Sequence, residues 1–319
     1  MKEIFYIIAF FVVVYLVFRL LVFFLRKGYY YIVIRINPNY AETYFNRGLA
    51  YEKEGDYDKA IADYDEAIRS NPNYAEAYYW RGSVYHEKGN KGEAIVNDAM
   101  RGYVYLNGEA IRLEPNDAEF FAYLRKRAYD RAISDYTKAI RLNHDFADAY
   151  HYRGNVYREK RAYDKAISDY NEAIRLNPNA GTYFNRGLAY GKKGDYDRAI
   201  SDHTEVIKLE STFVRTGGYT LRPEDSLSSL ASTFVRTLGY TLRGEAYEKK
   251  GDYDRAISDF SEAIRLKPKN AWAYRNRGKA YEEKGDHNKA IADYKSALRI
   301  DPDNSDAQEA LENLKRKMQ

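Results

Sequence analysis

Histidine, cysteine and carboxylate side chains are the groups best able to bind a metal or act in catalysis, and this sequence spaces none of them for either purpose. The absence of cysteine excludes disulfides, thiolate metal sites and cysteine nucleophiles. The sequence also lacks a P-loop, a GxSxG elbow and a GxGxxG loop after a predicted strand. The histidines lie far apart and form no HExxH or similar ligand pattern: His86, His144, His151, His203 and His287. We therefore predict no catalytic, cofactor-binding or metal-binding residue, and a protein that is not an enzyme.

Two other sets of polar residues are explained by helix structure rather than by chemistry. Asp63, Asp169 and Asp293 recur at equivalent points of a repeated pattern, which we interpret as a solvated helix face. His203 occupies a point where other copies of the pattern carry an aromatic residue. It is therefore predicted to lie at the edge of a helical core.

The charge balance argues against a nucleic-acid partner. The chain has 51 Lys and Arg against 47 Asp and Glu, for a formal net charge of +4 and a pI near 8.7. Nucleic-acid-binding proteins usually gather a basic excess on one face, and no such excess is visible in this sequence. We expect a protein or peptide partner instead.

The first part of the chain has the composition of a membrane anchor. Residues 4–25 contain a single charge, Arg19, and as a helix would span about 33 Å, enough for the hydrocarbon core of a bilayer. A cleavable signal peptide needs small residues near its cleavage site, but Ala9 is the only alanine before Ala41. We therefore predict a single-pass transmembrane anchor at residues 1–27. The positive-inside rule places the rest of the chain in the cytoplasm, although Lys2 leaves the opposite orientation open.

Most of the remaining chain follows one repeated pattern. Pro38 and Pro72 are 34 residues apart, as are Pro268 and Pro302. Counting from the first residue of a unit (Ala41 in the first), an aromatic residue occupies position 4, Gly position 8, Tyr position 11, Ala position 20, and usually Tyr or Phe position 24. Small residues at positions 8 and 20 let two helices approach closely, and the aromatic residues fill the space that remains.

These residues at these offsets resemble the tetratricopeptide repeat. The resemblance implies an all-α fold, an α-solenoid of tetratricopeptide helical hairpins, here preceded by one transmembrane helix. The array is expected at residues 41–304, in about seven units. A remnant half-repeat at 28–40 precedes it, and a capping helix at 305–319 follows it.

Two stretches depart from the period. Near 96–131 the pattern is irregular: a shortened copy, RGYVYLNGEAI, lies inside the second unit (75–117), and the third unit (118–146) is short. Near 211–236 the sequence STFVRTGGYTLR recurs 21 residues later as STFVRTLGYTLR. We interpret the second stretch as a duplication tolerated in a surface loop, with a binding loop as the alternative.

One hairpin turn departs from the others. Four units carry Gly-Asp at the turn, which supplies a left-handed residue and then an N-cap. The unit that begins at Ala147 has Arg161-Ala162 there. If all the hairpins share one geometry, Arg161 must adopt a left-handed conformation and the helix after Ala162 must lack a capping side chain.

The resemblance also implies a binding surface. Tetratricopeptide proteins bind partner segments in a concave groove lined by the first helix of each hairpin, chiefly at positions 2, 5, 6, 9, 12 and 13. Transferred to this sequence, the groove comprises Phe45, Asn46, Tyr79, Trp80, His151, Asn155, Phe184, Asn185, Arg275, Asn276 and Lys279. Asn46, Asn185 and Asn276 share position 6 and resemble an asparagine ladder that grips a peptide backbone.

The function expected from the sequence is a membrane-tethered scaffold or adaptor that holds a partner segment in this groove. Two alternatives remain: a structural component that associates with itself, and an accessory module of an enzyme complex.

Overall fold

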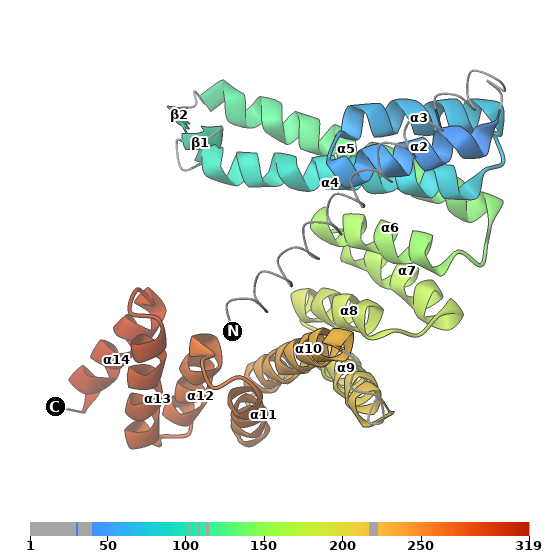
Figure 1. Cartoon of the computed structure of the whole chain (residues 1–319). Helices are drawn as coiled ribbons and strands as arrows, with labels where there is room; N and C mark the ends of the chain where they lie inside the picture. Colours follow the sequence, from blue (N-terminus) through green and yellow to red (C-terminus); the bar gives the residue numbers. More distant parts are fainter. Residues whose placement is uncertain are drawn as a thin grey trace, which may run out of the picture. The chain divides into compact units, whose positions relative to one another are not determined.

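The computed structural model describes residues 30, 40–100, 103–106, 109–112, 115–216 and 223–318, and at 92–118 and 212–231 it describes the backbone alone. The described chain is almost entirely helical (Figure 1). It divides into two compact units, residues 1–156 and 157–319. The first contains α2 (Ala41–Glu54), α3 (Tyr57–Ser70), α4 (Ala75–Met100), α5 (Pro115–Leu142) and most of α6 (Ala147–Glu159).

The second unit continues the same alternation of helices. Its helices are α7 (Tyr163–Leu176), α8 (Ala180–Lys193), α9 (Tyr196–Thr216), α10 (Pro223–Lys249), α11 (Tyr253–Leu266), α12 (Ala271–Glu283), α13 (His287–Ile300) and α14 (Ser305–Lys317). Consecutive helices pack as hairpins, as in α2 with α3, α8 with α9 and α12 with α13. The all-α solenoid predicted from the repeat is confirmed.

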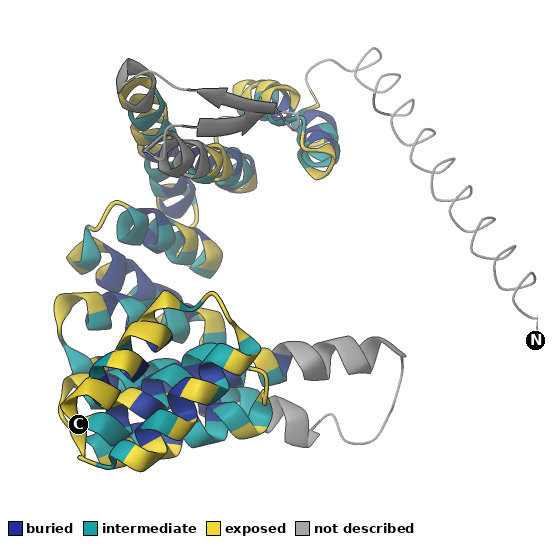
Figure 2. Ribbon diagram, turned by 90° about the vertical axis from the view of Figure 1, so that its left-hand side faces the viewer, coloured by how far each residue is buried: buried dark blue, intermediate teal, exposed yellow. Residues whose placement is uncertain are grey.

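In several hairpins the core forms where an aromatic ring lies against a glycine. A Cβ added at Gly48 would come within 2.7 Å of the Tyr64 ring, and one added at Gly278 within 2.9 Å of the Tyr294 ring. The two rings are almost completely buried. Figure 2 shows buried residues distributed along the helices. Position 8 is therefore small because the ring at position 24 of the same hairpin occupies the space of its side chain.

The carboxylates predicted to face solvent are buried, and that interpretation is wrong. Asp63 is 4% exposed, Asp169 5% and Asp293 6%. For Asp63 and Asp293 the reason is a guanidinium at position 7 of the first helix, sixteen residues earlier. Arg47 donates from Nε and Nη2 to the two carboxylate oxygens of Asp63, at 2.7 and 2.6 Å.

The same paired hydrogen bonds recur along the array. Arg186 binds Asp202, Arg243 binds Asp259 and Arg277 binds Asp293, each through two nitrogens at 2.7–2.9 Å. The bond to Asp293 raises the pKa of Arg277, so its guanidinium stays charged. We call this paired interaction the Arg–Asp clamp.

In several clamp arginines the third nitrogen reaches the preceding repeat. Nη1 of Arg277 donates to Ser261 Oγ at 3.0 Å, and Nη1 of Arg243 donates to Thr204 Oγ1 at 3.1 Å. Arg153 bonds Thr137 Oγ1 in the same way at 3.0 Å. One side chain therefore joins the two helices of its own hairpin and also ties that hairpin to its neighbour.

The two units expected at 75–117 and 118–146 form a single hairpin. Arg81 on α4 makes the clamp with Asp135 on α5, 54 residues later, at 2.8 and 2.6 Å. A Cβ added at Gly82 would lie 3.2 Å from the Tyr136 ring, the contact that Gly48, Gly244 and Gly278 make within their own hairpins. Residues between about 90 and 128 are thus an extension inside one repeat: α4 runs on past the usual turn, and α5 returns (Figure 1).

The far end of this extension carries two short strands that the repeat pattern did not predict. β1 (Tyr103–Leu106) pairs antiparallel with β2 (Glu109–Arg112), with Tyr103 opposite Arg112 and Leu106 opposite Glu109. The sequence between the strands is Asn-Gly, the dipeptide that most strongly favours a two-residue hairpin turn. The shortened repeat copy inferred from RGYVYLNGEAI is therefore a β-hairpin in its described residues.

The described residues of the irregular stretch at 211–236 are helical, where a surface loop was expected. Residues 211–216 continue α9, and residues 223–236 begin α10. The predicted anchor at 4–25, and all of the half-repeat at 28–40 except Tyr30 and Tyr40, lie outside the described residues. Among the helices that the structure does describe, none combines the length and apolar composition needed to cross a bilayer.

The hairpin turns confirm the shared geometry expected from the sequence. Gly55, Gly194, Gly251 and Gly285 have φ between 76° and 81°. Arg161 takes the same left-handed conformation with φ 58° and is the non-glycine residue with positive φ in the described chain. The N-cap of α7, Ala162, makes no side-chain hydrogen bond.

We therefore predict that the double change Arg161→Gly, Ala162→Asp stabilises the protein. Glycine removes the left-handed strain, about 1 kcal/mol, and aspartate adds a cap worth about 1 kcal/mol. Chemical denaturation of the full chain should show a higher midpoint for the transition that includes α7 and α8, because solenoids unfold in blocks. The reverse change at a regular turn, Gly251→Arg with Asp252→Ala, should lower the midpoint. An unchanged midpoint in the first variant would contradict the prediction.

Candidate functional site

The first helices of the second compact unit enclose a cavity of about 370 Å³. Its walls come from α8, α10 and α12, with His203 and neighbours from α9 at its base. Leu188 and Leu242 supply apolar surface, and charged side chains of both signs surround them. Three predicted groove residues, Arg275, Asn276 and Lys279, line this cavity.

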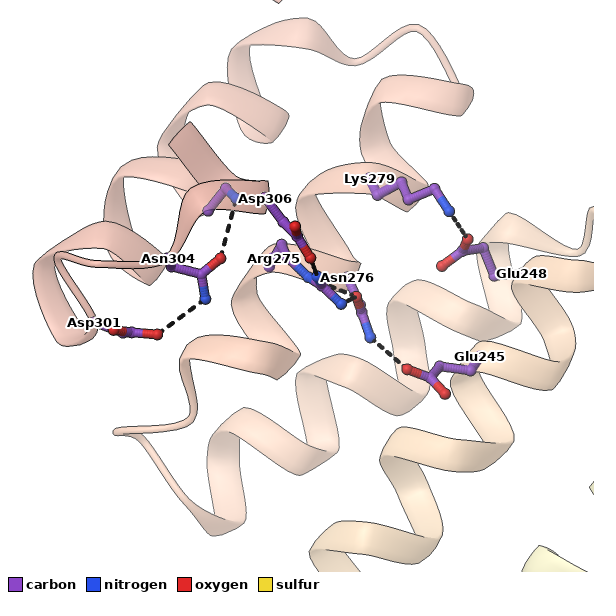
Figure 3. Close-up of polar contacts among 9 residues, drawn as sticks. Glu245, Glu248, Arg275, Asn276, Lys279, Asp301, Asn304 and Asp306 are labelled. Carbon is purple, nitrogen blue, oxygen red and sulfur yellow. Dashed lines mark hydrogen bonds and ion pairs between the residues drawn. The ribbon is translucent and has the colours of Figure 1, made fainter. Parts of the chain in front are cut away.

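Asn276 is held by a network inside the protein (Figure 3). It is 5% exposed, and its Nδ2 donates to Glu245 Oε1 at 2.8 Å. Its Oδ1 accepts from Nε and Nη2 of Arg275 at 3.2 and 3.0 Å, and Arg275 also pairs with Asp306 at the start of α14. In this structure the amide predicted to grip a peptide backbone binds its own neighbours.

A second hydrogen-bonded pair joins α10 and α12 at the same cavity. Lys279 Nζ donates to Glu248 Oε1 at 2.6 Å, and Figure 3 shows this pair alongside Glu245 and Asn276. Burial raises the pKa of Glu245, and the hydrogen bond from Asn276 opposes that rise. Two carboxylates of α10 thus bind an amide and a cation of α12 beside the cavity.

Two lysines complete the cavity, and the groove predicted from the sequence did not include them. Lys192 and Lys249 occupy position 13 of adjacent repeats and line the cavity with exposed side chains. Their sequence neighbours are paired elsewhere: Lys250 with Asp197 and Lys193 with Asp164. The resemblance already gave position 13 as a groove position, so applying it to these two units would have identified both lysines.

Phe184 and Asn185 lie on α8, which contributes other residues to the cavity, but neither of the two lines it. Both are half-buried. The Phe184 ring lies edge-on to the His203 ring, with centroids 6.1 Å apart. Phe184 therefore contributes to the core behind the cavity.

In the first compact unit the predicted groove residues build an aromatic cluster. The Tyr79 ring contacts Trp80 at 5.3 Å and Tyr152 at 5.9 Å between centroids. Tyr79 is buried, whereas Tyr152 is 37% exposed. Tyr79 is thus a core residue, and Trp80 and Tyr152 form the more accessible part of this face.

The remaining groove residues of this unit are half-buried. Phe45 packs against Tyr74 with centroids 5.0 Å apart, and Asn46 follows it on α2. Asn155 Nδ2 and His151 Nε2 lie 3.2 Å apart on α6, within hydrogen-bond distance. The predicted set therefore forms two surfaces, an aromatic one in residues 1–156 and a charged cavity in residues 157–319.

His203 lies at the base of the cavity with its ring buried. A Cβ added at Gly187 would come within 2.7 Å of that ring, so His203 takes the place of the usual aromatic residue. Burial lowers the pKa of His203 to about 4, and nearby Arg243 adds to the effect. Its Nδ1 is buried without a hydrogen-bond partner. The interpretation as a core histidine agrees with this packing.

A pH dependence of stability follows from His203. The pKa is about 4 in the folded protein, against about 6.5 for an unperturbed histidine, so the unfolded chain binds more protons between these values. Above pH 6.5 this histidine does not lower the free energy of unfolding. As the pH falls toward 4, protonation of the unfolded chain lowers that free energy by up to about 3 kcal/mol. His203→Phe should remove this component, as measured by denaturant midpoints at several pH values. The same slope in both proteins over this range would contradict the assignment.

Family models match the repeats across the described chain. A TPR repeat model matches residues 53–89, 122–160, 154–194 and 244–285, and a tetratricopeptide repeat model matches 180–213 and 271–304. A further tetratricopeptide repeat model matches 29–62, which includes most of the remnant half-repeat. A comparison with curated proteins finds no match.

Solved structures share the fold at low sequence identity. YrrB, described as a TPR protein with an unusual peptide-binding site, is 21% identical, with a TM-score of 0.51, over 77% of this chain and 96% of its own. PilF of Pseudomonas aeruginosa is 15% identical, with a TM-score of 0.52, over 84% of this chain and 95% of its own. Tetratricopeptide proteins mediate protein–protein or peptide interactions, and this chain belongs to the tetratricopeptide repeat family.

Proposed function

We propose that this protein is a membrane-tethered, non-enzymatic adaptor that binds a peptide segment of a partner protein along the first helices of its repeats. The observation that carries the proposal is the cavity between α8, α10 and α12, which is lined by first-helix residues of successive repeats. Pockets that bind ligands combine apolar surface with a few placed polar groups, and this cavity has both.

The chemistry of the cavity selects the segment it would accept. Leu188 and Leu242 offer a site for an apolar side chain. Lys192 and Lys249, exposed at the same wall, offer cations for a carboxylate beside it. We therefore expect a segment in which an apolar residue is flanked by an acidic one.

The two glutamates set a limit on the partner. Glu245 and Glu248 are already bound to Asn276 and Lys279. A bound segment would either leave these pairs intact or replace one member with its own group, because an unpaired buried charge is costly. The pairs therefore favour a segment that contacts the lysines and the leucines.

The tether is proposed from the sequence. Residues 4–25 have the length and composition of a spanning helix, and the basic residues that follow favour a cytoplasmic array. An adaptor held at a membrane surface would concentrate its partner there.

One experiment addresses both parts of the proposal. Membranes from cells that make the full chain are washed with carbonate, and peptides from a random displayed library are selected on them. The protein should stay with the membranes, and the selected peptides should bind at least tenfold more weakly to Lys192→Glu, Lys249→Glu, measured by fluorescence anisotropy. A matched control, Lys193→Glu with Lys250→Glu, makes the same charge change outside the cavity.

Different results would contradict different parts. Release of the full chain by carbonate would contradict the tether. Selected peptides whose affinity is the same for the cavity variant and the control would contradict the assignment of this cavity as the binding site.

A further inference from the structure

The extension inside the second repeat creates a second concave surface, which belongs to the first compact unit. Where α5 returns, it passes the turn between α2 and α3 and encloses a cavity of about 650 Å³ with α4. Its lining includes Tyr57 and Ile61 from α3, Tyr85 from α4, and Phe121 and Leu124 from α5. In a regular tetratricopeptide hairpin the first helix would end near residue 90, so this surface exists only because of the extension.

Apolar side chains at and beside this cavity are left open to solvent. Phe120 is 57% exposed, Tyr123 57% and Leu124 40%, within five residues of one helix. These are among the most exposed large apolar side chains in the described chain. Contiguous exposed apolar residues rimmed by polar groups usually mark an interaction site.

The acidic and basic residues that line this cavity differ in how they are engaged within the protein. Both acidic lining residues are engaged: Asp58 pairs with Lys88 at 2.7 Å, and Asp56 caps α3 and pairs with Lys59 at 2.5 Å. Among the cations, Lys91 lies against an aromatic face, with its Nζ 4.3 Å from the centre of the Tyr57 ring.

Arg131 also lies against an aromatic face. The Arg131 guanidinium lies 5.2 Å from the centre of the Tyr85 ring, and Arg127 is exposed. An aromatic face holds a cation in place without neutralising its charge. The cavity therefore presents apolar surface with a positive rim.

We propose that an acidic amphipathic segment of a partner protein docks at one surface of the first unit. This surface is formed by α5 residues 120–131 with Tyr57 and Lys91. Such a segment would place an apolar side chain in the cavity beside Leu124 and carboxylates against Lys91, Arg127 and Arg131. The concave form favours a peptide over the flat surface of a membrane. The positive rim favours an acidic partner over a basic one.

The test uses the full chain in detergent micelles and two fluorescent peptide pools. In one pool Glu and Asp alternate with Leu, Phe and Trp; in the other every acidic residue is replaced by Lys. The acidic pool should bind, more weakly as salt rises from about 50 to 300 mM, because the contact is partly electrostatic. The double variant Leu124→Asp, Arg127→Glu should weaken binding at least tenfold.

Matched variants separate this surface from the rest of the protein. Lys295→Glu reverses an exposed charge on α13, outside the cavity, and should leave binding unchanged. Lys192→Glu with Lys249→Glu alters the first-helix cavity and should also leave it unchanged, so the two proposals fail independently. Circular dichroism of each variant shows whether the helices persist.

Four results would overturn the proposal. These are equal binding of the basic pool, no binding of the acidic pool, an unchanged affinity in the Leu124, Arg127 variant, and displacement of the peptides by phosphatidylglycerol vesicles. The last would assign the surface to an anionic membrane. Sedimentation that shows self-association lost in the same variant, without peptide binding, would assign it to a second copy of the chain.

Discussion

The Arg–Asp clamp is the interaction on which the rest of the structure depends. A guanidinium and a carboxylate are removed from water together, and Asp259 and Asp293 are each about one-twentieth exposed. Burial of two charges is costly, and only good geometry offsets it, here two hydrogen bonds of 2.7–2.8 Å in each pair. Loss of one partner would leave the other charged and buried, so the two positions constrain each other.

The clamp leaves the first-helix face free to vary. The arginine at position 7 binds the aspartate of its own hairpin and reaches the preceding repeat. The neighbouring positions of the first helix can therefore carry different side chains in different repeats. In residues 1–156 these positions form an aromatic cluster around Tyr79, and in residues 157–319 they form a charged cavity. The same Arg–Asp clamp therefore supports two different surfaces. The extension at α5 adds a third surface, which does not depend on the clamp positions.

Much of this fold could be predicted from the sequence, because close helix packing, left-handed turns and helix caps each require particular residue types. Glycine at position 8 indicated the ring beside it, and Arg161-Ala162 indicated a strained, uncapped turn. The burial of Asp63 was missed because an aspartate in a polar helix predicts solvent, and its partner lies 16 residues away. The single hairpin of α4 and α5 was missed because Asp135 pairs 54 residues back, beyond the period used to divide the chain. In the candidate site, Arg275, Asn276 and Lys279 were found by position, whereas the pairing of Asn276 with Glu245 depends on the side-chain geometry of two helices.

A double-mutant cycle on Arg277 and Asp293 tests the central claim most directly. The free energy of unfolding is measured by denaturation for Arg277→Gln, Asp293→Asn and the double variant of the full chain. We predict that each single change costs about 3 kcal/mol or more, since each leaves a buried charge without its partner. The double change should cost at least about 1.5 kcal/mol less than the sum, because the two residues act as one unit. Additive costs, or single changes that cost almost nothing, would show that the clamp does not hold the hairpin together.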